Sequence, residues 1–407
     1  MKNYIIWESY TSTELPNGQP WDIIWEKRRL PMRKTINVAV VGTGFMGKTH
    51  SYAISNLRYF YSDLLFEACL HTVCSRTEEN ANKAKEQYGF KYEVTDYDKV
   101  VLNPEIDVVS ICTPNSMHAE QIIKAVRNGK HVYCEKPAVT TRDEAIMVQN
   151  VLKDTQNVCG IVFNNRYFPA TMRAKQLVEE GRIGNVVGFS GRYLHSSGLN
   201  RSSYGWRGDR KMSGGGALYD LGSHVVDLIT HITGNRIKSV IGKGHILNKA
   251  ITDCDEHFSM IARLENGGLG TITVSRITIG TNDDLEIEIH GDKGAIKFNL
   301  MEPNKLYFFD GSKKTSPYGG ESGYTVIDCI GKYEYPGGVF PSSKAPVSWL
   351  RGHVHSMYIF LQSVYEGDTE LEKGAKLLDS LNINCILEAA LVSNETGKEE
   401  EVRYINN

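Results

Sequence analysis

The chain has 407 residues, a length that favours two domains over a single hydrophobic core. Its 46 basic and 48 acidic residues give a formal net charge of −2, and no Lys/Arg block suggests a nucleic-acid or anionic-membrane surface. No apolar run reaches the roughly 20 residues of a membrane-spanning helix, and the N-terminus lacks a signal-peptide pattern. We therefore expect a soluble, cytoplasmic protein that binds small molecules.

The eight cysteines are scattered along the chain without any C-x-x-C spacing, and most lie in apolar runs. This usage favours buried free thiols in a reducing compartment over disulfides or a structural zinc site. The sequence therefore predicts no metal centre built from cysteine.

The first 35 residues form an arm that precedes the first predicted strand. Trp7, Trp21 and Trp25 make this arm too aromatic for a disordered tail. Two interpretations stay open: the arm packs on its own domain, or it covers a neighbouring subunit or the cofactor site.

Residues 36–163 alternate between predicted strands and helices, which indicates a parallel sheet with helices on both faces. A capping box at Thr141 and Glu144 opens one helix, and Gly129 ends another. The pattern predicts a complete doubly wound Rossmann domain. Its strands are expected near 36–42, 68–75, 91–94, 107–112, 131–134 and 158–163.

A glycine-rich turn follows the first strand of this domain. Gly42, Gly44 and Gly47 have the G-x-G-x-x-G spacing of dinucleotide-binding proteins, although ordinary turns also produce it. The helix expected to begin near Phe45 and Met46 offers free N–H groups and its positive dipole end to a pyrophosphate. We therefore predict that an NAD(P) cofactor binds at this turn.

The end of the second strand indicates which cofactor fits. An acidic residue there would bond the adenine ribose and repel a 2′-phosphate, but the chain has Ser75 and Arg76 instead. Glu67 lies at the start of that strand, which is the wrong end of the sheet. Because Arg76 can neutralise a phosphate, we favour NADP over NAD; the alternative is that Arg76 stacks on the adenine.

Two further strands end in polar residues at the edge where open α/β sheets bind ligands. The first is followed by Thr113, Pro114 and Asn115, and the second by Glu135 and Lys136. The proline after Lys136 disfavours a helical backbone, so its side chain should extend into the crevice. These residues, together with His118 of the same run, are expected to contact the cofactor or the substrate.

Residues 164–407 have a different pattern, in which consecutive strands joined by short turns predict a mainly antiparallel sheet. We expect an α+β domain that binds substrate and forms the oligomer contact. Its strands are expected near 185–194, 237–247, 256–264, 269–279 and 285–290, and a helix near 170–181. The stretch 302–350, rich in Gly, Pro, Ser and Tyr, is interpreted as a long loop that forms a lid or an oligomer contact.

A polar row lies on the helix that follows the glycines at 214–216. Asp220, His224, Asp227 and His231 recur at helical spacing on the face opposite the apolar stripe. The row is explained by a solvated face, by a metal site without a visible third ligand, or by a catalytic pair in which Asp220 orients and charges His224.

Four segments together resemble the glucose–fructose oxidoreductase/inositol dehydrogenase (Gfo/Idh/MocA) family. They are VAVVGTGFMGKTH, ICTPNSMHAEQIIKAVRNGKHVYCEKP, WRGDRKMSGGGALYDLGSHVVDLITHITG and LEIEIHGDKGAIKF. The resemblance implies a Rossmann domain, a large open C-terminal sheet and oxidation or reduction of a carbinol carbon. It places the family's catalytic lysine, aspartate and histidine on Lys136, Asp220 and His224, and it favours the catalytic interpretation of the polar row.

The expected function is hydride transfer between NAD(P) and a sugar, glycoside or cyclitol. Trp206 and Arg207 are expected to form part of the substrate pocket, whereas His353 and His355 are assigned no role. One alternative is a redox-assisted glycoside hydrolase or lyase that recycles its bound cofactor, and another is a regulatory dinucleotide-binding protein. The resemblance also implies a homodimer or homotetramer.

Overall fold

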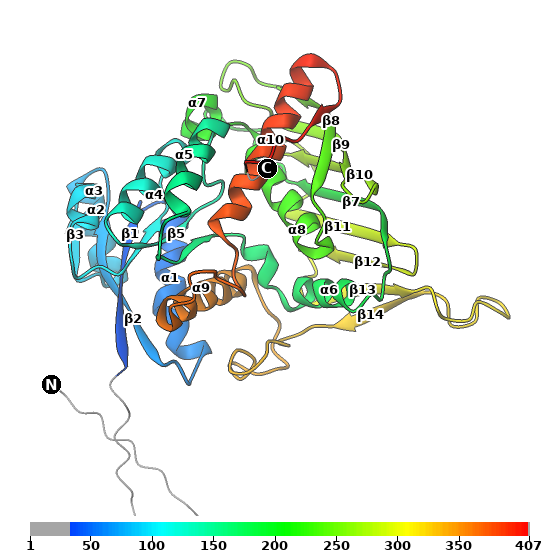
Figure 1. Cartoon of the computed structure of the whole chain (residues 1–407), viewed down its shortest axis with the longest axis horizontal. Helices are drawn as coiled ribbons and strands as arrows, with labels where there is room; N and C mark the ends of the chain where they lie inside the picture. Colours follow the sequence, from blue (N-terminus) through cyan, green and yellow to red (C-terminus); the bar gives the residue numbers. More distant parts are fainter. Residues whose placement is uncertain (1–32, 406–407) are drawn as a thin grey trace, which may run out of the picture.

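A computed structural model describes residues 33–405 of the protein, so most of the expected N-terminal arm lies outside the described residues. The described chain forms two sheets, with strand orders β3-β2-β1-β4-β5-β6 and β14-β13-β12-β11-β7-β10-β9-β8-β15. Figure 1 shows the smaller sheet and its helices on the left and the larger sheet on the right.

The six-stranded sheet is parallel throughout, as the sequence predicts. The order of its strands reverses between β1 and β4, and this reversal opens a crevice at the carboxyl ends of the strands. The strands are β1 Lys34–Val41, β2 Phe66–Cys74, β3 Tyr92–Val94, β4 Val108–Ile111, β5 His131–Cys134 and β6 Cys159–Ile161. The helices are α1 Phe45–Phe60, α2 Glu78–Tyr88, α3 Tyr97–Val101, α4 His118–Arg127 and α5 Arg142–Leu152.

Local sequence explains these elements. The last four residues of β1, Val38 to Val41, are all buried, because helices cover both faces of the sheet. The predicted capping box is present at the start of α5, where Thr141 and Glu144 exchange hydrogen bonds between side chain and backbone.

The nine-stranded sheet is antiparallel except for β7 and β10, which lie side by side and run parallel. This parallel pair brings the carboxyl ends of two strands to the same edge. The strands are β7 Val186–Leu194, β8 Ile237–His245, β9 His257–Leu264, β10 Leu269–Ser275, β11 Asp284–Gly291, β12 Gly294–Asn299, β13 Lys305–Asp310, β14 Tyr324–Asp328 and β15 Glu400–Glu401. The helices are α6 Pro169–Glu179, α7 Arg210–Ser213, α8 Ser223–Thr233, α9 Trp349–Glu366 and α10 Leu377–Thr396.

The segment 302–350 is not one long loop, and this part of the prediction is wrong. It contains β13 and β14, which extend the sheet beyond β12, and it ends with the first residues of α9. Leu306 and Phe308 face the core from β13. The sequence prediction missed these strands because they are short and the turns on either side are rich in glycine and proline, so the composition of the whole segment is that of a loop.

Two C-terminal helices tie the halves of the molecule together. Helix α9 packs against α1, and α10 packs against α5 and β8. In Figure 1 both helices lie between the two sheets. Residues near the start of α9 therefore reach the crevice of the six-stranded sheet, although they are about 300 residues away from α1 in the chain.

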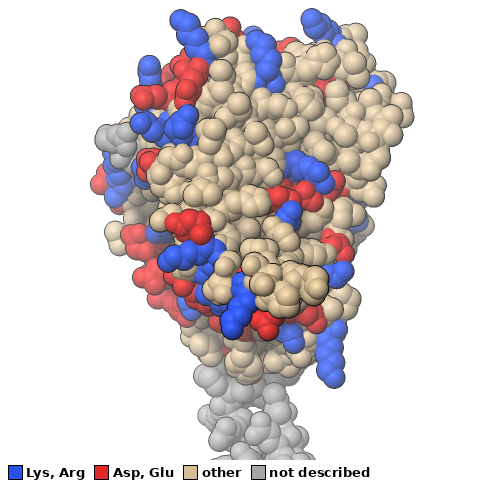
Figure 2. All heavy atoms as spheres, turned by 90° about the vertical axis from the view of Figure 1, so that its right-hand side faces the viewer, with Lys and Arg blue, Asp and Glu red and all other residues tan. Residues whose placement is uncertain are grey.

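Helices α6, α8 and α10 cover only one face of the large sheet. Figure 2 views the molecule from the side of the other face and shows a broad uncharged area bordered by charged side chains. Exposed apolar side chains on these strands include Val187, Ile241, Ile261 and Leu269. Within residues 33–405, no helix is long and apolar enough to cross a membrane.

Candidate active site

A cavity of about 960 Å³ lies between the carboxyl edge of the six-stranded sheet and the elements that face it from the larger sheet. Ser75 and Arg76 at the end of β2 line one end of the cavity, and Asp220, His224 and Arg276 line the other. The glycine turn after β1 lies between these ends. The volume of the cavity, and the different residues that line its two ends, suit a ligand whose two ends differ in chemistry.

The glycine turn has the backbone that a phosphate site requires. Gly42 has φ +101°, and a Cβ there would lie 2.5 Å from the carbonyl oxygen of Cys112. Gly44 is the N-cap of α1 and forms no side-chain cap hydrogen bond, and a Cβ on Gly44 would enter open space. The N–H groups of the first turn of α1 therefore remain available to an anion from the cavity, so the turn fits a dinucleotide pyrophosphate.

The adenine end contains no carboxylate among the described cavity-lining residues around β2. The Ser75 hydroxyl lies 3.0 Å from the hydroxyl of Thr43 in the glycine turn. Arg76 is exposed at the rim of the cavity. The part of the cavity lining that the structure describes therefore places no negative charge at this end to repel a 2′-phosphate.

A buried ion pair underlies the middle of the cavity. Nε2 of His50 lies 3.0 Å from a carboxylate oxygen of Glu135, and Nδ1 lies 2.7 Å from the hydroxyl of Ser110. Burial lowers the pKa of His50, but contacts with Cys112 and Glu135 outweigh burial and raise it to about 10. His50 is therefore positively charged at neutral pH, and Glu135 is held in place immediately before Lys136.

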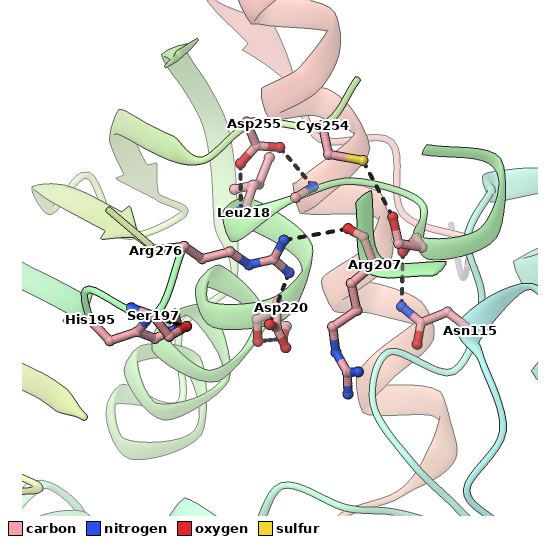
Figure 3. Close-up of polar contacts among 12 residues, drawn as sticks. Asn115, His195, Ser197, Arg207, Leu218, Asp220, Cys254, Asp255 and Arg276 are labelled. Atoms are coloured by element: carbon pink, nitrogen blue, oxygen red, sulfur yellow. Dashed lines mark hydrogen bonds and ion pairs between the residues drawn. The ribbon is translucent and has the colours of Figure 1, made fainter. Parts of the chain in front are cut away.

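Asp255 anchors the segment that carries the catalytic candidates. Its carboxylate accepts hydrogen bonds from the backbone N–H of Gly216 at 2.9 Å and of Leu218 at 2.7 Å (Figure 3). A Cβ on Gly216 would lie 1.8 Å from the carbonyl oxygen of Asp255, so glycine is required there. The segment then forms a π-helical turn, Leu218–Gly222, before α8 begins.

Lys136 and Arg276 hold the Asp220 carboxylate between them. Nζ of Lys136 donates to Oδ1 of Asp220 at 2.8 Å and to the backbone oxygen of Asp220 at 2.7 Å. Arg276 donates to Oδ2 at 2.9 Å, the contact drawn in Figure 3. Burial raises the pKa of Asp220, but the charges of Lys136 and Arg276, with Arg207 contributing less, hold it well below its usual value. Asp220 is therefore ionised.

His224 is buried and lines the cavity, but its ring does not bond to Asp220. The side-chain amide of Asn165 lies 3.3 Å from Nδ1 of His224. The hydrogen bond by which Asp220 was expected to orient His224 is therefore not formed, whereas the charge of Asp220 does act on the ring by raising its pKa. The physical reason is that Lys136 and Arg276 occupy the two carboxylate oxygens of Asp220, so neither oxygen bonds to the ring.

The protonation state of His224 follows from its surroundings. Burial, reinforced by the charge of Lys136 and opposed by Asp220, holds the pKa of His224 well below its ordinary value. The ring is therefore neutral. Nε2 forms no hydrogen bond within residues 33–405, so this nitrogen is available to a ligand in the cavity.

Trp206 and Arg207 lie on the cavity wall opposite the six-stranded sheet. The Arg207 guanidinium stacks 4.4 Å from the centre of the Trp206 ring, and its backbone oxygen accepts from Arg276 at 3.4 Å. In Figure 3 the Arg207 side chain points away from Arg276 into the space beside Asn115. The amide of Asn115 donates to the backbone oxygen of Ser213 at 2.9 Å, which ties the two walls together.

The structure brings nearly all of the sequence-predicted site residues to this one cavity, including both members of the Trp206-Arg207 pair. The lining residues among them are Gly42, Gly44, Phe45, Met46, Ser75, Arg76, Thr113, Pro114, Asn115, Glu135, Lys136, Trp206, Arg207, Asp220 and His224.

Two predicted cofactor residues do not line the cavity. His118 is fully buried, and its ring nitrogens each lie 2.9 Å from a backbone oxygen, of Pro137 and of Thr113. Its role is therefore to hold the two lining loops together. Gly47 packs against the start of the glycine turn, because a Cβ there would lie 2.0 Å from the carbonyl oxygen of Gly42.

Sequence reasoning missed several lining residues. Asn165 follows β6, Arg276 follows β10 and His195 follows β7, so the rule applied to the ends of β4 and β5 could have found them. No local signal marks Trp349 and His353, which reach the cavity only because α9 packs on α1. Within residues 33–405, no group of three or more His, Cys, Asp or Glu side chains could hold a metal ion, and all eight cysteines are free.

Relatives of known activity match most of the chain. The levoglucosan dehydrogenase of Pseudarthrobacter phenanthrenivorans is 29% identical over 356 residues, covering 82% of this chain and 90% of the relative. The scyllo-inositol 2-dehydrogenase (NAD(+)) of Bacillus subtilis is 29% identical over 269 residues, 65% of this chain and 74% of the relative. A solved levoglucosan dehydrogenase in complex with NADH and levoglucosan superposes with a TM-score of 0.84 at 27% identity, covering 91% of this chain and 100% of that one.

Family profiles match both halves of the chain. The profile described as "Oxidoreductase family, NAD-binding Rossmann fold" matches residues 36–163, and the one described as "GFO/IDH/MocA C-terminal domain" matches residues 171–297. The first match contains the glycine turn and Lys136, and the second contains Asp220, His224 and Arg276. With both walls of the cavity matched, the chain belongs to the Gfo/Idh/MocA family of NAD-binding oxidoreductases.

Proposed function

We propose that the protein is a dehydrogenase that acts on a carbinol carbon of a sugar or cyclitol, with Lys136 and His224 as its catalytic residues. The observation that supports this most is the position of Lys136. Two of its three N–H donors are used by Asp220, at 2.7 and 2.8 Å, and no other residue of 33–405 accepts from the third, which can donate to a substrate oxygen at the end of the cavity.

In the oxidation direction the protein handles the hydroxyl proton. In this proposal His224 is the neutral tautomer with its proton on Nδ1, which requires the Asn165 amide to turn its oxygen towards Nδ1, and the lone pair of Nε2 then removes the hydroxyl proton as a general base. The remaining N–H of Lys136 donates to the same oxygen and stabilises the negative charge that develops on it. NAD, when bound, supplies the hydride acceptor for oxidation and the donor for reduction.

Asp220 acts through Lys136 in this proposal. Its carboxylate fixes the direction of the ammonium group, and the second ion pair to Arg276 fixes the carboxylate. Asn165 has the corresponding role for His224, because an amide oxygen turned towards Nδ1 would accept from Nδ1–H, fix the ring and leave the lone pair of Nε2 to the substrate.

The class of substrate rests on the relatives, which are named for levoglucosan and for inositols. They give no support to a glycoside hydrolase that recycles its cofactor. For the cofactor, we propose that Arg76 allows NADP as well as NAD, since no carboxylate among residues 33–405 lines the adenine end. We also propose a domain boundary near residue 163 and a homodimer or homotetramer that buries the uncovered face of the large sheet.

The purified protein should be mixed with NAD or NADP and a panel containing levoglucosan, inositol isomers and aldoses, and the absorbance at 340 nm followed. We expect reduction of the cofactor with at least one member of the panel. Cleavage of a glycoside without any net change at 340 nm would contradict the proposal.

A further inference from the structure

His353 is a buried side chain without a partner. It lies in the second turn of α9 and is 3% exposed. Neither of its ring nitrogens has a hydrogen-bond partner within residues 33–405, yet the residue lines the cavity. Buried polar atoms are nearly always satisfied, so two free ring nitrogens at a cavity wall point to a ligand that completes them.

The neighbours of His353 fix its position along the cavity. Its ring lies 4.2 Å, centre to centre, from that of Trp349. Trp349 in turn stacks on Phe45 of the glycine turn at 5.7 Å, with 28° between the ring planes. His353 therefore lies one aromatic ring beyond the phosphate-binding turn, on the way towards His224.

The charge state of His353 is set by the same surroundings. Burial, with smaller contributions from His50 and His224, holds the pKa of His353 well below its ordinary value. The ring is therefore neutral and has one N–H donor and one acceptor nitrogen. Such a ring suits an uncharged group that both donates and accepts.

We propose that His353 recognises the nicotinamide end of the cofactor by a hydrogen bond to the carboxamide, with Trp349 as the adjacent wall. This inference rests on the dinucleotide occupying the cavity as proposed above. A dinucleotide whose pyrophosphate lies at the glycine turn extends from it along the crevice, past the ends of β4 and β5, towards Lys136. The carboxamide is the group of that end that presents both N–H donors and a carbonyl acceptor.

His355 provides a matched control on the same helix. It is also buried, but its Nδ1 is hydrogen-bonded to the Tyr61 hydroxyl at 2.7 Å and it does not line the cavity. Replacing either histidine by phenylalanine removes a buried imidazole from α9. Only the His353 change should alter recognition of the nicotinamide.

Binding should be measured by isothermal titration, without substrate, for the wild type and the His353→Phe, His353→Gln and His355→Phe proteins. The ligands are NAD, ADP-ribose, which lacks nicotinamide, and 3-acetylpyridine adenine dinucleotide, in which a methyl group replaces the amide nitrogen. We expect His353→Phe to weaken NAD by about 5- to 10-fold and ADP-ribose by less than about twofold, the worth of one hydrogen bond.

The ratio of the NAD and ADP-ribose affinities should be unchanged in His355→Phe and partly restored in His353→Gln. The wild-type preference for NAD over the acetyl analogue should disappear in His353→Phe. Equal weakening of NAD and ADP-ribose would make His353 a structural residue. An unchanged NAD affinity in His353→Phe would remove His353 from the nicotinamide site, and either result overturns the proposal. Failure of the wild type to bind any of the three ligands would instead refute the dinucleotide site itself.

Discussion

The two ends of the cavity are built in different ways. At the glycine turn a ligand meets backbone N–H groups from one continuous segment, and no side chain caps the start of α1 within the described chain. At the far end it meets charged and polar side chains from separate elements, among them Lys136 after β5, Asp220 in the π-helical turn and Arg276 after β10.

Because of this difference, we expect cofactor affinity to depend mainly on the glycine turn and the rate of the reaction mainly on the side chains at the far end. Backbone groups are positioned by the fold, so the glycine turn depends on space and φ angles more than on any one side chain. The reaction end depends on ion pairs in which each partner orients the next, as Arg276, Asp220 and Lys136 show. Substitutions at the two ends should therefore produce different kinds of defect.

The largest expected effect is at Lys136. Lys136→Met removes the ammonium that we propose stabilises the substrate oxygen, and among the described residues it leaves Asp220 with Arg276 as its ion-pair partner. We expect kcat to fall by roughly 10³-fold. Steady-state rates at 340 nm give this value, and titration with NADH should show nearly unchanged binding. A lower affinity for NADH with an unchanged kcat would show that Lys136 acts in cofactor binding and not in the reaction.

His224→Ala should lower kcat by roughly 10²-fold or more, the usual worth of a positioned base. Asn165→Ala should lower kcat by a smaller factor, because it removes the hydrogen bond that orients the His224 ring. Measuring kcat as a function of pH for both proteins tests the assignment. Turnover close to that of the wild type in folded, NADH-bound His224→Ala would remove His224 from the mechanism.

The sequence could predict the glycine turn and the ends of β4 and β5 because each lies within one short segment. A buried strand followed by spaced glycines constrains its own backbone, so Gly42, Gly44 and Phe45 were identified without tertiary information. The catalytic candidates Asp220 and His224 were identified by family resemblance, since helical spacing alone also fits a solvated face.

The rest depends on packing between distant segments. Arg276 reaches Asp220 because β7 and β10 are parallel neighbours, and their pairing across about 80 residues leaves no periodic signal. The π-helical turn that carries Asp220 has hydrogen bonds that span one residue more than those of an ordinary helix, and this difference leaves no periodic signal in the sequence. Strand β13 was missed because Gly- and Pro-rich turns surround it.

Two glycine substitutions separate fold from affinity within the turn. Gly42→Ala should destabilise the protein by roughly 1–3 kcal/mol, because φ is +101° and the new Cβ would lie 2.5 Å from the Cys112 oxygen. Gly44→Ala has open space and an ordinary φ, so it should weaken NADH and leave the unfolding midpoint nearly unchanged. Thermal unfolding and NADH titration of both proteins check this. Equal loss of stability in the two would show that Gly44 is also structural.

The neutral buried histidines predict a sensitivity to acid. Burial, reinforced by Arg351, lowers the pKa of His355 to about 3, whereas an unfolded chain has about 6.5. Because the unfolded chain binds the extra proton, the stability that this group contributes is complete above pH 6.5 and is lost as the pH falls towards 3. The loss amounts to about 1.4 kcal/mol per pH unit. The free energy of unfolding, measured with urea at pH 5, 6 and 7, should therefore depend less on pH in His355→Phe than in the wild type. The same pH dependence in both proteins would contradict a neutral His355 ring.

The smallest expected effect is at the adenine rim, where an exposed side chain acts on one phosphate. If Arg76 binds the 2′-phosphate, Arg76→Ala should weaken NADP by about 10-fold, the lower range for a charge-assisted hydrogen bond, because water screens the pair at the surface. NAD, which lacks that phosphate, should be affected much less. Isothermal titration of both cofactors at two salt concentrations tests the charge directly, since the NADP difference should shrink at high salt. Equal weakening of NAD and NADP binding would leave Arg76 with a stacking role on the adenine. Cofactor recognition at the adenine end, like that at the glycine turn, would then not depend on the charge of a side chain.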